Sequence, residues 1–183
     1  MNYLQRKKRA IISMHQDFIP SGYKRVEYLE STGTQYIQLP QLLNNDIITV
    51  KALTKNTLNY RTIIGSNSNN RYELYFDNGV IKTWDNIKVI SVSGSGTNRP
   101  IEVQAQKRGD SKLANLLFDY NTSNQYNLIG NIYKFQIKGA EKIVLNLIPC
   151  LDNNNRPCMY DTVSKKTYYN QGTGEFLYGE VIN

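Results

Sequence analysis

The segment 71–84 is Arg71-Tyr72-Glu73-Leu74-Tyr75-Phe76-Asp77-Asn78-Gly79-Val80-Ile81-Lys82-Thr83-Trp84. Two runs rich in aromatic and β-branched residues flank the pair Asn78-Gly79. Asn-Gly tolerates the positive φ angles that a two-residue type I′ turn requires. The segment therefore predicts a β-hairpin.

Strand patterns continue on both sides of this hairpin. The expected strands are 34–39, 47–53, 87–92, 101–105, 113–118, 132–137 and 143–148. Glycine and asparagine clusters separate them at about the 8–12-residue spacing of sandwich strands. A chain of this kind buries its apolar faces as two packed sheets. We therefore expect an all-β, two-sheet antiparallel sandwich, and the number of strands favours a jelly roll of the lectin type over an immunoglobulin fold.

Charge divides the chain unequally. The 183 residues carry a net charge of +7. Residues 1–25 hold six basic side chains and one acidic, whereas the rest holds 16 basic and 14 acidic. The breaker Pro20-Ser21-Gly22 follows the basic segment. We therefore expect a basic N-terminal arm over 1–22 and one domain over 23–183, whose near-neutral body argues against nucleic-acid binding.

The arm combines a basic run with apolar residues. Its candidate anchoring residues are Arg6, Lys7, Lys8, Arg9, Ile11 and Ile12. Two interpretations stay open: a frayed terminus and a docking element that orders on a partner. The apolar stretch 10–12 is shorter than the core of a signal peptide. No segment reaches the ~18 apolar residues of a membrane span, so we expect folding in a cytoplasm and no membrane partner.

Residues for catalysis are sparse. The single histidine, His15, lies in the arm, away from Cys150 and Cys158, so a nucleophile–base pair is not expected. The acids are scattered and lack the paired spacing of a glycosidase; they include Glu27, Glu30, Glu73, Asp77, Glu102, Asp161 and Glu175. We expect no catalytic residue and no enzymatic activity.

Metal and cofactor motifs are equally weak. Cys150 and Cys158 match neither a redox pair nor a zinc site, and free thiols are favoured over a disulfide. The run 152–155, Asp-Asn-Asn-Asn, offers oxygens for one Ca²⁺, although an Asn-rich turn is the favoured interpretation. We expect no metal and no cofactor.

Binding surface remains as the source of function. Tyr72, Tyr75 and Trp84 share the predicted hairpin. Aromatic side chains are enriched at protein interfaces, and they can stack on sugar rings. These three residues are the candidate ligand-binding patch, although packing in the core is the default for any one of them.

Both ends of the domain resemble a known family. The first segment is 22–37, Gly-Tyr-Lys-Arg-Val-Glu-Tyr-Leu-Glu-Ser-Thr-Gly-Thr-Gln-Tyr-Ile. The second comprises 132–137, 147–150, 156–164 and 170–176. They resemble the opening and closing strands of laminin-G-like, concanavalin A-like jelly-roll domains of bacteriophage virion proteins. On this basis the first-strand core should come from Tyr28, Leu29, Tyr36 and Ile37, and Ser31-Thr32-Gly33 should form a turn. Residues 172–174 should form a tight hairpin that returns the last strand beside the first.

The resemblance implies a virion component. Its partners would be other virion proteins, including copies of itself, and its location the particle assembled in the host cytoplasm. The small size suits a head-decoration or head-fibre subunit anchored by the arm. The alternative is a module of a tail or fibre that binds carbohydrate or a host receptor, and a glycoside hydrolase is the third possibility.

Overall fold

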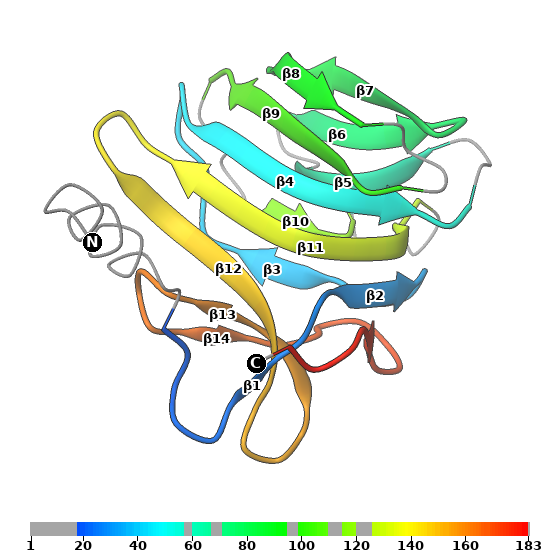
Figure 1. The fold of residues 1–183 in the computed structure, drawn as a ribbon. Helices are drawn as coiled ribbons and strands as arrows, with labels where there is room; N and C mark the ends of the chain where they lie inside the picture. Colours follow the sequence, from blue (N-terminus) through cyan, green and yellow to red (C-terminus); the bar gives the residue numbers. More distant parts are fainter. Residues whose placement is uncertain are drawn as a thin grey trace, which may run out of the picture.

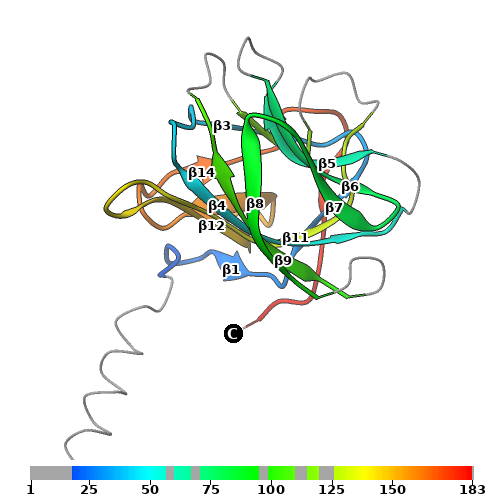
Figure 2. The ribbon, with the colours of Figure 1, turned by 90° about the horizontal axis from the view of Figure 1, so that it is seen from above.

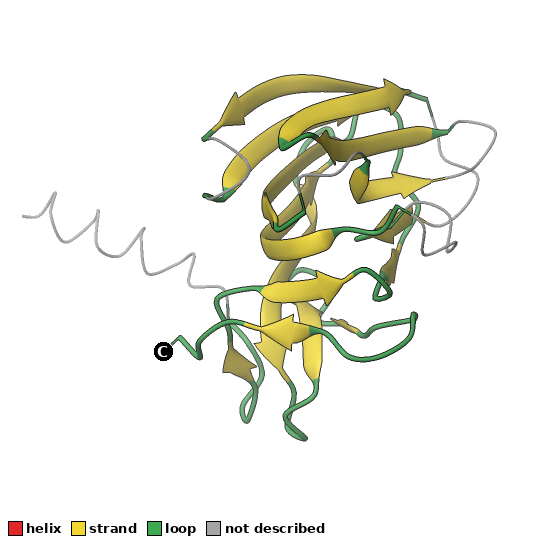
Figure 3. Ribbon diagram, turned by 90° about the vertical axis from the view of Figure 1, so that its right-hand side faces the viewer, coloured by secondary structure: helices red, strands yellow, loops and turns green. Residues whose placement is uncertain are grey.

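The computed structural model shows an all-β protein (Figures 1 and 3). It describes residues 18–56, 60–66, 71–94, 99–109, 115–119 and 126–182. Within these ranges the chain forms fifteen strands and no helix. No helix in the described ranges is therefore long and apolar enough to cross a membrane.

Ten strands form the larger sheet. They are β1 (Lys24–Arg25), β2 (Leu29–Thr32), β4 (Ile47–Thr54), β8 (Ile87–Ser93), β9 (Ile101–Lys107), β11 (Ile129–Lys138), β12 (Ile143–Leu151), β13 (Pro157–Asp161), β14 (Thr167–Tyr168) and β15 (Leu177–Tyr178). The main order is β14-β13-β12-β11-β4-β9-β8, with β1 on β12, β2 on β11 and β15 on β2. In Figure 1, strands β12, β11, β4 and β9 run side by side across the front of the molecule.

Five strands form the smaller sheet. They are β3 (Ile37–Leu39), β5 (Arg61–Ser66), β6 (Tyr72–Asp77), β7 (Val80–Asp85) and β10 (Asn115–Leu117), in the order β3-β10-β5-β6-β7. Strands β7 and β8, the edge strands of the two sheets, lie side by side (Figure 2). The named strands of both sheets pair antiparallel. The predicted all-β, two-sheet antiparallel architecture is confirmed.

The hairpin of β6 and β7 forms where the sequence predicts it. Asp77 pairs with Val80 across the turn. Asn78 and Gly79 have φ angles of 51° and 74°, the left-handed pair that defines a type I′ turn. The local chemistry of Asn-Gly therefore sets the register of this half of the smaller sheet.

The core lies between the two sheets, and one of its inward-facing rows ends in a lysine. Alternating residues of β4 and β9 point inward, so Val50, Val103 and Ala105 are fully buried. Lys107 continues this inward row and is also fully buried. Its Nζ donates to the carbonyls of Arg108 at 2.6 Å and Gly109 at 2.8 Å, and lies 4.8 Å from the ring centre of Tyr72. These contacts compensate part of the cost of burying an ammonium group.

The two ends of the domain differ from the expected pattern in detail. Residues 28–37 do not form one strand, because β2 belongs to the larger sheet and β3 to the smaller. Ser31 and Thr32 end β2 instead of forming a turn. Gly33, with φ of 109°, then redirects the chain toward the smaller sheet. A positive φ of this kind suits glycine, because it has no Cβ to clash with the backbone.

The closing segment also departs from a tight hairpin. Strand β14 pairs with β13, and β15 pairs with β2, so the strands on either side of 172–174 do not pair with each other. The segment instead lies along the opening one: Gln171 N donates to Tyr36 O at 2.9 Å, and Thr173 N to Thr34 O at 3.2 Å. The last strand does return to the start of the domain, where β15 lies beside β2.

The structure describes only the end of the predicted arm. Its six candidate anchoring residues, Arg6, Lys7, Lys8, Arg9, Ile11 and Ile12, lie outside the described residues. Ile19, near the end of the predicted arm, packs on an apolar cluster formed by Ile148, Cys150, Cys158 and Tyr160. This contact fixes the point at which the chain enters the domain, on β12 and β13.

Candidate functional site

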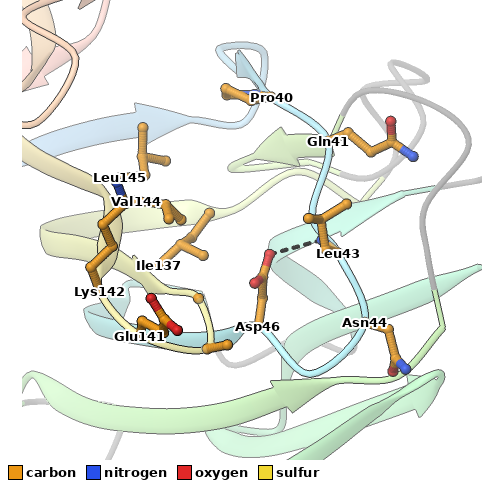
Figure 4. A pocket seen from close by; sticks show the side chains of 12 residues that line it. Pro40, Gln41, Leu43, Asn44, Asp46, Ile137, Glu141, Lys142, Val144 and Leu145 are labelled. Carbon is orange, nitrogen blue, oxygen red and sulfur yellow. Dashed lines mark hydrogen bonds between the residues drawn. The ribbon is translucent and has the colours of Figure 1, made fainter.

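Two of the pockets on the described surface differ in chemistry. The first has a volume of about 510 Å³ and lies between the segment before β4 and the β11–β12 hairpin. Figure 4 shows Leu43 on one side of it and Ile137 and Val144 on the other. Its buried carboxylate, Asp46, accepts a hydrogen bond from Leu43 N at 2.8 Å (Figure 4). These walls suit an apolar group and contain no aromatic ring, although Gln41, Asn44, Glu141 and Lys142 are also among the lining residues.

The second pocket combines aromatic rings with charged groups. It has a volume of about 260 Å³ and is lined by Tyr60, Arg71, Glu73, Trp84 and Tyr126, which we call the Trp84 pocket. A small concave site with rings and a few convergent polar groups is the usual form of a ligand site. The Trp84 pocket is therefore the candidate functional site.

Strand alternation places the pocket on the outer face of the smaller sheet. Leu74 and Phe76 of β6 point into the core, so Glu73 and Tyr75 point outward. Trp84 on β7 lies directly opposite Glu73 and shares its face. Tyr72 takes the opposite face: it is buried in the core, and its hydroxyl donates to Asn115 Oδ1 at 2.6 Å.

The structure therefore separates the three predicted patch residues. Trp84 is 40% exposed and lines the pocket, whereas Tyr75 is only 5% exposed. Tyr75 stacks under Tyr60 with 5.0 Å between ring centres, so it supports the pocket from below. Tyr72 cannot touch a ligand in this pocket, because it lies on the other side of the sheet.

The aromatic walls are held by several ring contacts. Tyr60 lies 6.0 Å from Tyr126 in an edge-to-face arrangement and 6.5 Å from Trp84, measured between ring centres. Tyr60 has a φ of 54°, a left-handed conformation that is rare for a bulky side chain. Such strain clusters at functional sites. Arg71 covers part of the Trp84 ring, with its Cζ 4.9 Å from the ring centre.

Glu73 is the one carboxylate among the described lining residues. It is 2% exposed. Its Oε1 accepts a short hydrogen bond from Thr62 Oγ1, and Arg71 lies 3.8 Å from its Oε2. Burial raises the pKa of the Glu73 carboxyl above its ordinary value, and the nearby Asp119 raises it further, while Thr62 and Arg71 act in the opposite direction.

We predict that Glu73→Gln raises the melting temperature at pH 7 and has little effect near pH 4. The folded state holds the Glu73 proton more tightly than the unfolded state, so its contribution to stability is fully present below the ordinary pKa of 4.5 and is lost as the pH rises through the raised pKa. Glutamine carries no charge to bury and should escape this loss. Thermal melts across this pH range, with the exposed Glu102→Gln as control, test the prediction. A constant difference between wild type and E73Q at all pH values would contradict it.

Two acids that the sequence leaves scattered come together here. Asp119 is fully buried and interacts electrostatically with Glu73. The side-chain amide of Asn127, with its nitrogen turned toward Asp119, donates to both carboxylate oxygens at 2.8 and 3.2 Å. Glycosidases place two carboxyls on either side of the scissile bond, one as acid and the other as base or nucleophile. In the described part of the chain, only Glu73 reaches the pocket wall.

Other candidate residues have structural roles. Asp152 Oδ1 accepts hydrogen bonds from Asn154 N and Arg156 N, both at 2.9 Å, and Oδ2 accepts one from Tyr169 at 3.0 Å. Its oxygens thus close a turn, as the favoured interpretation of 152–155 expects. No group of three metal-ligating side chains occurs in the described ranges.

The cysteines and the remaining acids lie away from the pocket. Cys150 and Cys158 are opposite each other on β12 and β13, free and buried, and burial raises the pKa of each thiol to about 12. Glu30 and Asp77 pair with lysines. Asp161 accepts hydrogen bonds from Asn146 N, Val163 N and Ser164 N. His15 lies outside the described residues.

Sequence reasoning missed most of the pocket. Tyr60 and Tyr126 come from loop segments next to β5 and β11, far apart in the chain. The hydrogen bond from Thr62 N to Tyr126 O, at 2.8 Å, brings these two segments together. No local sequence pattern predicts this bond. For Tyr72 a signal existed: Tyr72 and Tyr75 are three residues apart, so a strand must place them on opposite faces.

Comparisons with known proteins returned no relative. No protein-family model, no curated protein and no solved structure matches this chain.

Proposed function

We propose that this protein is a non-enzymatic, carbohydrate-binding surface module of a bacteriophage particle, with a concanavalin A-like jelly-roll fold and the Trp84 pocket as its sugar site. The exposed Trp84 beside the buried Glu73 carries the proposal. One face of a sugar ring presents C–H groups that pack on an aromatic plane, while its hydroxyls need hydrogen-bonding partners. The Trp84 pocket offers both within one small volume.

Three features of the site support sugar binding. Two neighbours hold the Trp84 indole in place: Arg71, which comes just before β6, and the ring of Tyr60. Because the indole is already held, little side-chain entropy is lost when a ligand binds. Glu73 can accept, and Arg71 can donate, hydrogen bonds to neighbouring hydroxyls. The pocket volume of about 260 Å³ suits one sugar unit at the end of a chain or on a branch.

We propose that the Trp84 pocket binds a sugar without hydrolysing it. The described walls of the Trp84 pocket contain a single carboxyl residue, Glu73. Asp119, its neighbour, is buried, and both of its carboxylate oxygens accept from the side-chain nitrogen of Asn127. Hydrolysis of a bound glycan that is lost on Glu73→Gln would overturn this part of the proposal.

We predict that Trp84→Ala weakens glycan binding by about thirtyfold, because an aromatic side chain that becomes covered by a ligand contributes about 2 kcal/mol. The wild-type protein would first be screened on an array of bacterial surface polysaccharides, and its best glycan would be titrated by calorimetry. Tyr178→Ala is the matched control, since Tyr178 is also about half exposed but lies on β15 of the other sheet. Silence across the array, or equal losses for both variants, would contradict the sugar site.

A structural role in the particle is the second candidate. Ile19 and Tyr23 pack on the cluster of β12 and β13, so the arm leaves the domain from a fixed point. An arm held in this way suits anchoring of a head-decoration or head-fibre subunit. Deletion of residues 1–17 should then abolish incorporation into particles without lowering the melting temperature, and normal incorporation of the truncated protein would refute the anchoring role.

A further inference from the structure

The outer face of the larger sheet carries a polar row that crosses five adjacent strands. Each strand contributes one residue at the same level: Asn146 on β12, Gln136 on β11, Thr49 on β4, Gln104 on β9 and Ser91 on β8. We call this row the amide stripe. Gln136 Nε2 donates to Asn146 Oδ1 at 3.2 Å, which aligns the first two members. Adjacent strands are about 4.8 Å apart, so the row is about 19 Å long.

Lysines flank the amide stripe on both sides. On one side of the stripe lie Lys51 of β4 and Lys134 of β11, each two residues from the stripe residue of its own strand. On the other side lie Lys88 of β8 and Lys138 of β11. All four are exposed. Glu102 is the one acidic side chain in these flanking rows, so the face has an excess of three positive charges.

One pair of these lysines is unfavourable for folding. Lys134 and Lys51 stand directly opposite each other on the neighbouring strands β11 and β4. Like charges in this position destabilise a sheet. Lys51 Nζ lies 5.5 Å from the ring centre of Tyr133, although Glu102 is its partner on β9. Among the described residues, none of the four lysines forms an ion pair.

We propose that the outer face of the larger sheet is a second binding surface, separate from the Trp84 pocket, for a linear acidic polysaccharide. The polymer lies along the amide stripe, across the strands. Its hydroxyls bond to the exposed Gln104 and Ser91 and to the half-buried Gln136. Thr49 and Asn146, each 8% exposed, lie beneath this contact surface and hold the row in place. Its carboxylates or sulfates lie near Lys51 and Lys134, where they relieve the repulsion between the two ammonium groups.

The chemistry of the face favours a polysaccharide over a nucleic acid. The stripe consists of uncharged amide and hydroxyl groups, which match sugar hydroxyls, and the strand spacing is close to the length of one sugar unit. Recognition of single-stranded nucleic acid uses aromatic side chains on which bases stack. The stripe itself contains no aromatic residue. The flanking cations are all lysines, which act as point charges and lack the forked geometry with which arginine grips phosphate.

The test measures binding of the full chain to heparin, an acidic polysaccharide, and to dextran as a neutral one. We expect heparin binding that weakens as salt rises and no dextran binding at the stripe. The double variant Lys51→Gln/Lys134→Gln should lower heparin affinity by about thirtyfold. The variant Gln136→Ala/Gln104→Ala, which keeps every charge, should also weaken binding.

Two controls separate this surface from general charge and from the Trp84 pocket. Lys165→Gln/Lys166→Gln removes the same charge from exposed residues after β13 and should change heparin affinity by about threefold or less. Trp84→Ala should leave heparin binding unchanged, so failure of one site does not imply failure of the other. Without ligand, Lys134→Gln should raise the melting temperature, because it removes the opposed lysine pair. Equal losses in the two lysine double variants, or tighter binding to duplex DNA than to heparin, would overturn the proposal.

Discussion

Replacement of Lys107 by alanine is expected to lower the free energy of unfolding by about 3 kcal/mol. The side chain is fully buried between the sheets, and its Nζ donates to the carbonyls of Arg108 and Gly109. Alanine would leave a cavity against Tyr72 and remove the donor from both carbonyls. Chemical denaturation of the full chain, followed by tryptophan fluorescence, measures the loss.

Lys107→Met separates packing from charge. Methionine retains most of the apolar stem but has no ammonium group to bury, and replacing a buried charge by an apolar residue of similar volume is often close to neutral. We expect K107M to lose about 1 kcal/mol or less. Equal losses for K107A and K107M would show that the hydrogen bonds, and not the packing, dominate. If K107A lowers the free energy of unfolding by less than about 0.5 kcal/mol, the side chain of Lys107 is not buried in the core.

The sequence predicts the parts of the fold that depend on local chemistry. The β6–β7 hairpin follows from Asn78-Gly79 alone, because few other dipeptides tolerate two successive positive φ angles. The alternation over 101–105 likewise predicts the inward face of β9. Extending that alternation by two residues places Lys107 on the same buried face. The carbonyl partners that make this position tolerable depend on the path of the chain after β9, which no periodicity encodes.

The binding site is less predictable for a related reason. Trp84 is identified because it is the single tryptophan and lies in a hairpin with a clear turn signal. The position of Tyr60 in the pocket depends on its left-handed backbone conformation. The position of Tyr126 depends on the hydrogen bond that its carbonyl accepts from Thr62 N. The amide stripe consists of residues that are ordinary one by one, and it exists only after the register of five strands is known. Long-range pairing, which single-sequence patterns do not contain, assembles both surfaces.

Gly172→Ala is the second substitution with a large expected effect, a loss of about 3 kcal/mol in the free energy of unfolding. A Cβ at residue 172 would lie 1.9 Å from the carbonyl oxygen of Thr34, well inside van der Waals contact. The backbone of the closing segment or of Thr34 must therefore move, but hydrogen bonds hold both segments in place. Gln171 N donates to Tyr36 O, and Asn170 Oδ1 accepts from both Tyr36 N and Gly172 N. Thermal and denaturant unfolding of the purified variant measure the effect.

Gly139→Ala is the matched control for this substitution. A Cβ there would meet Val144 Cγ1 at 3.3 Å, a side-chain atom that can move by a few tenths of an ångström. We expect a change of about 0.5 kcal/mol or less. The contrast matters because Gly172 belongs to the closing segment that lies along Thr34–Tyr36 and so joins the two ends of the domain. If G172A is as stable as G139A, that contact does not hold the ends together, and the closure of the sandwich must depend on their other contacts, which include the pairing of β15 with β2 and the bridge between Val26 and Val181.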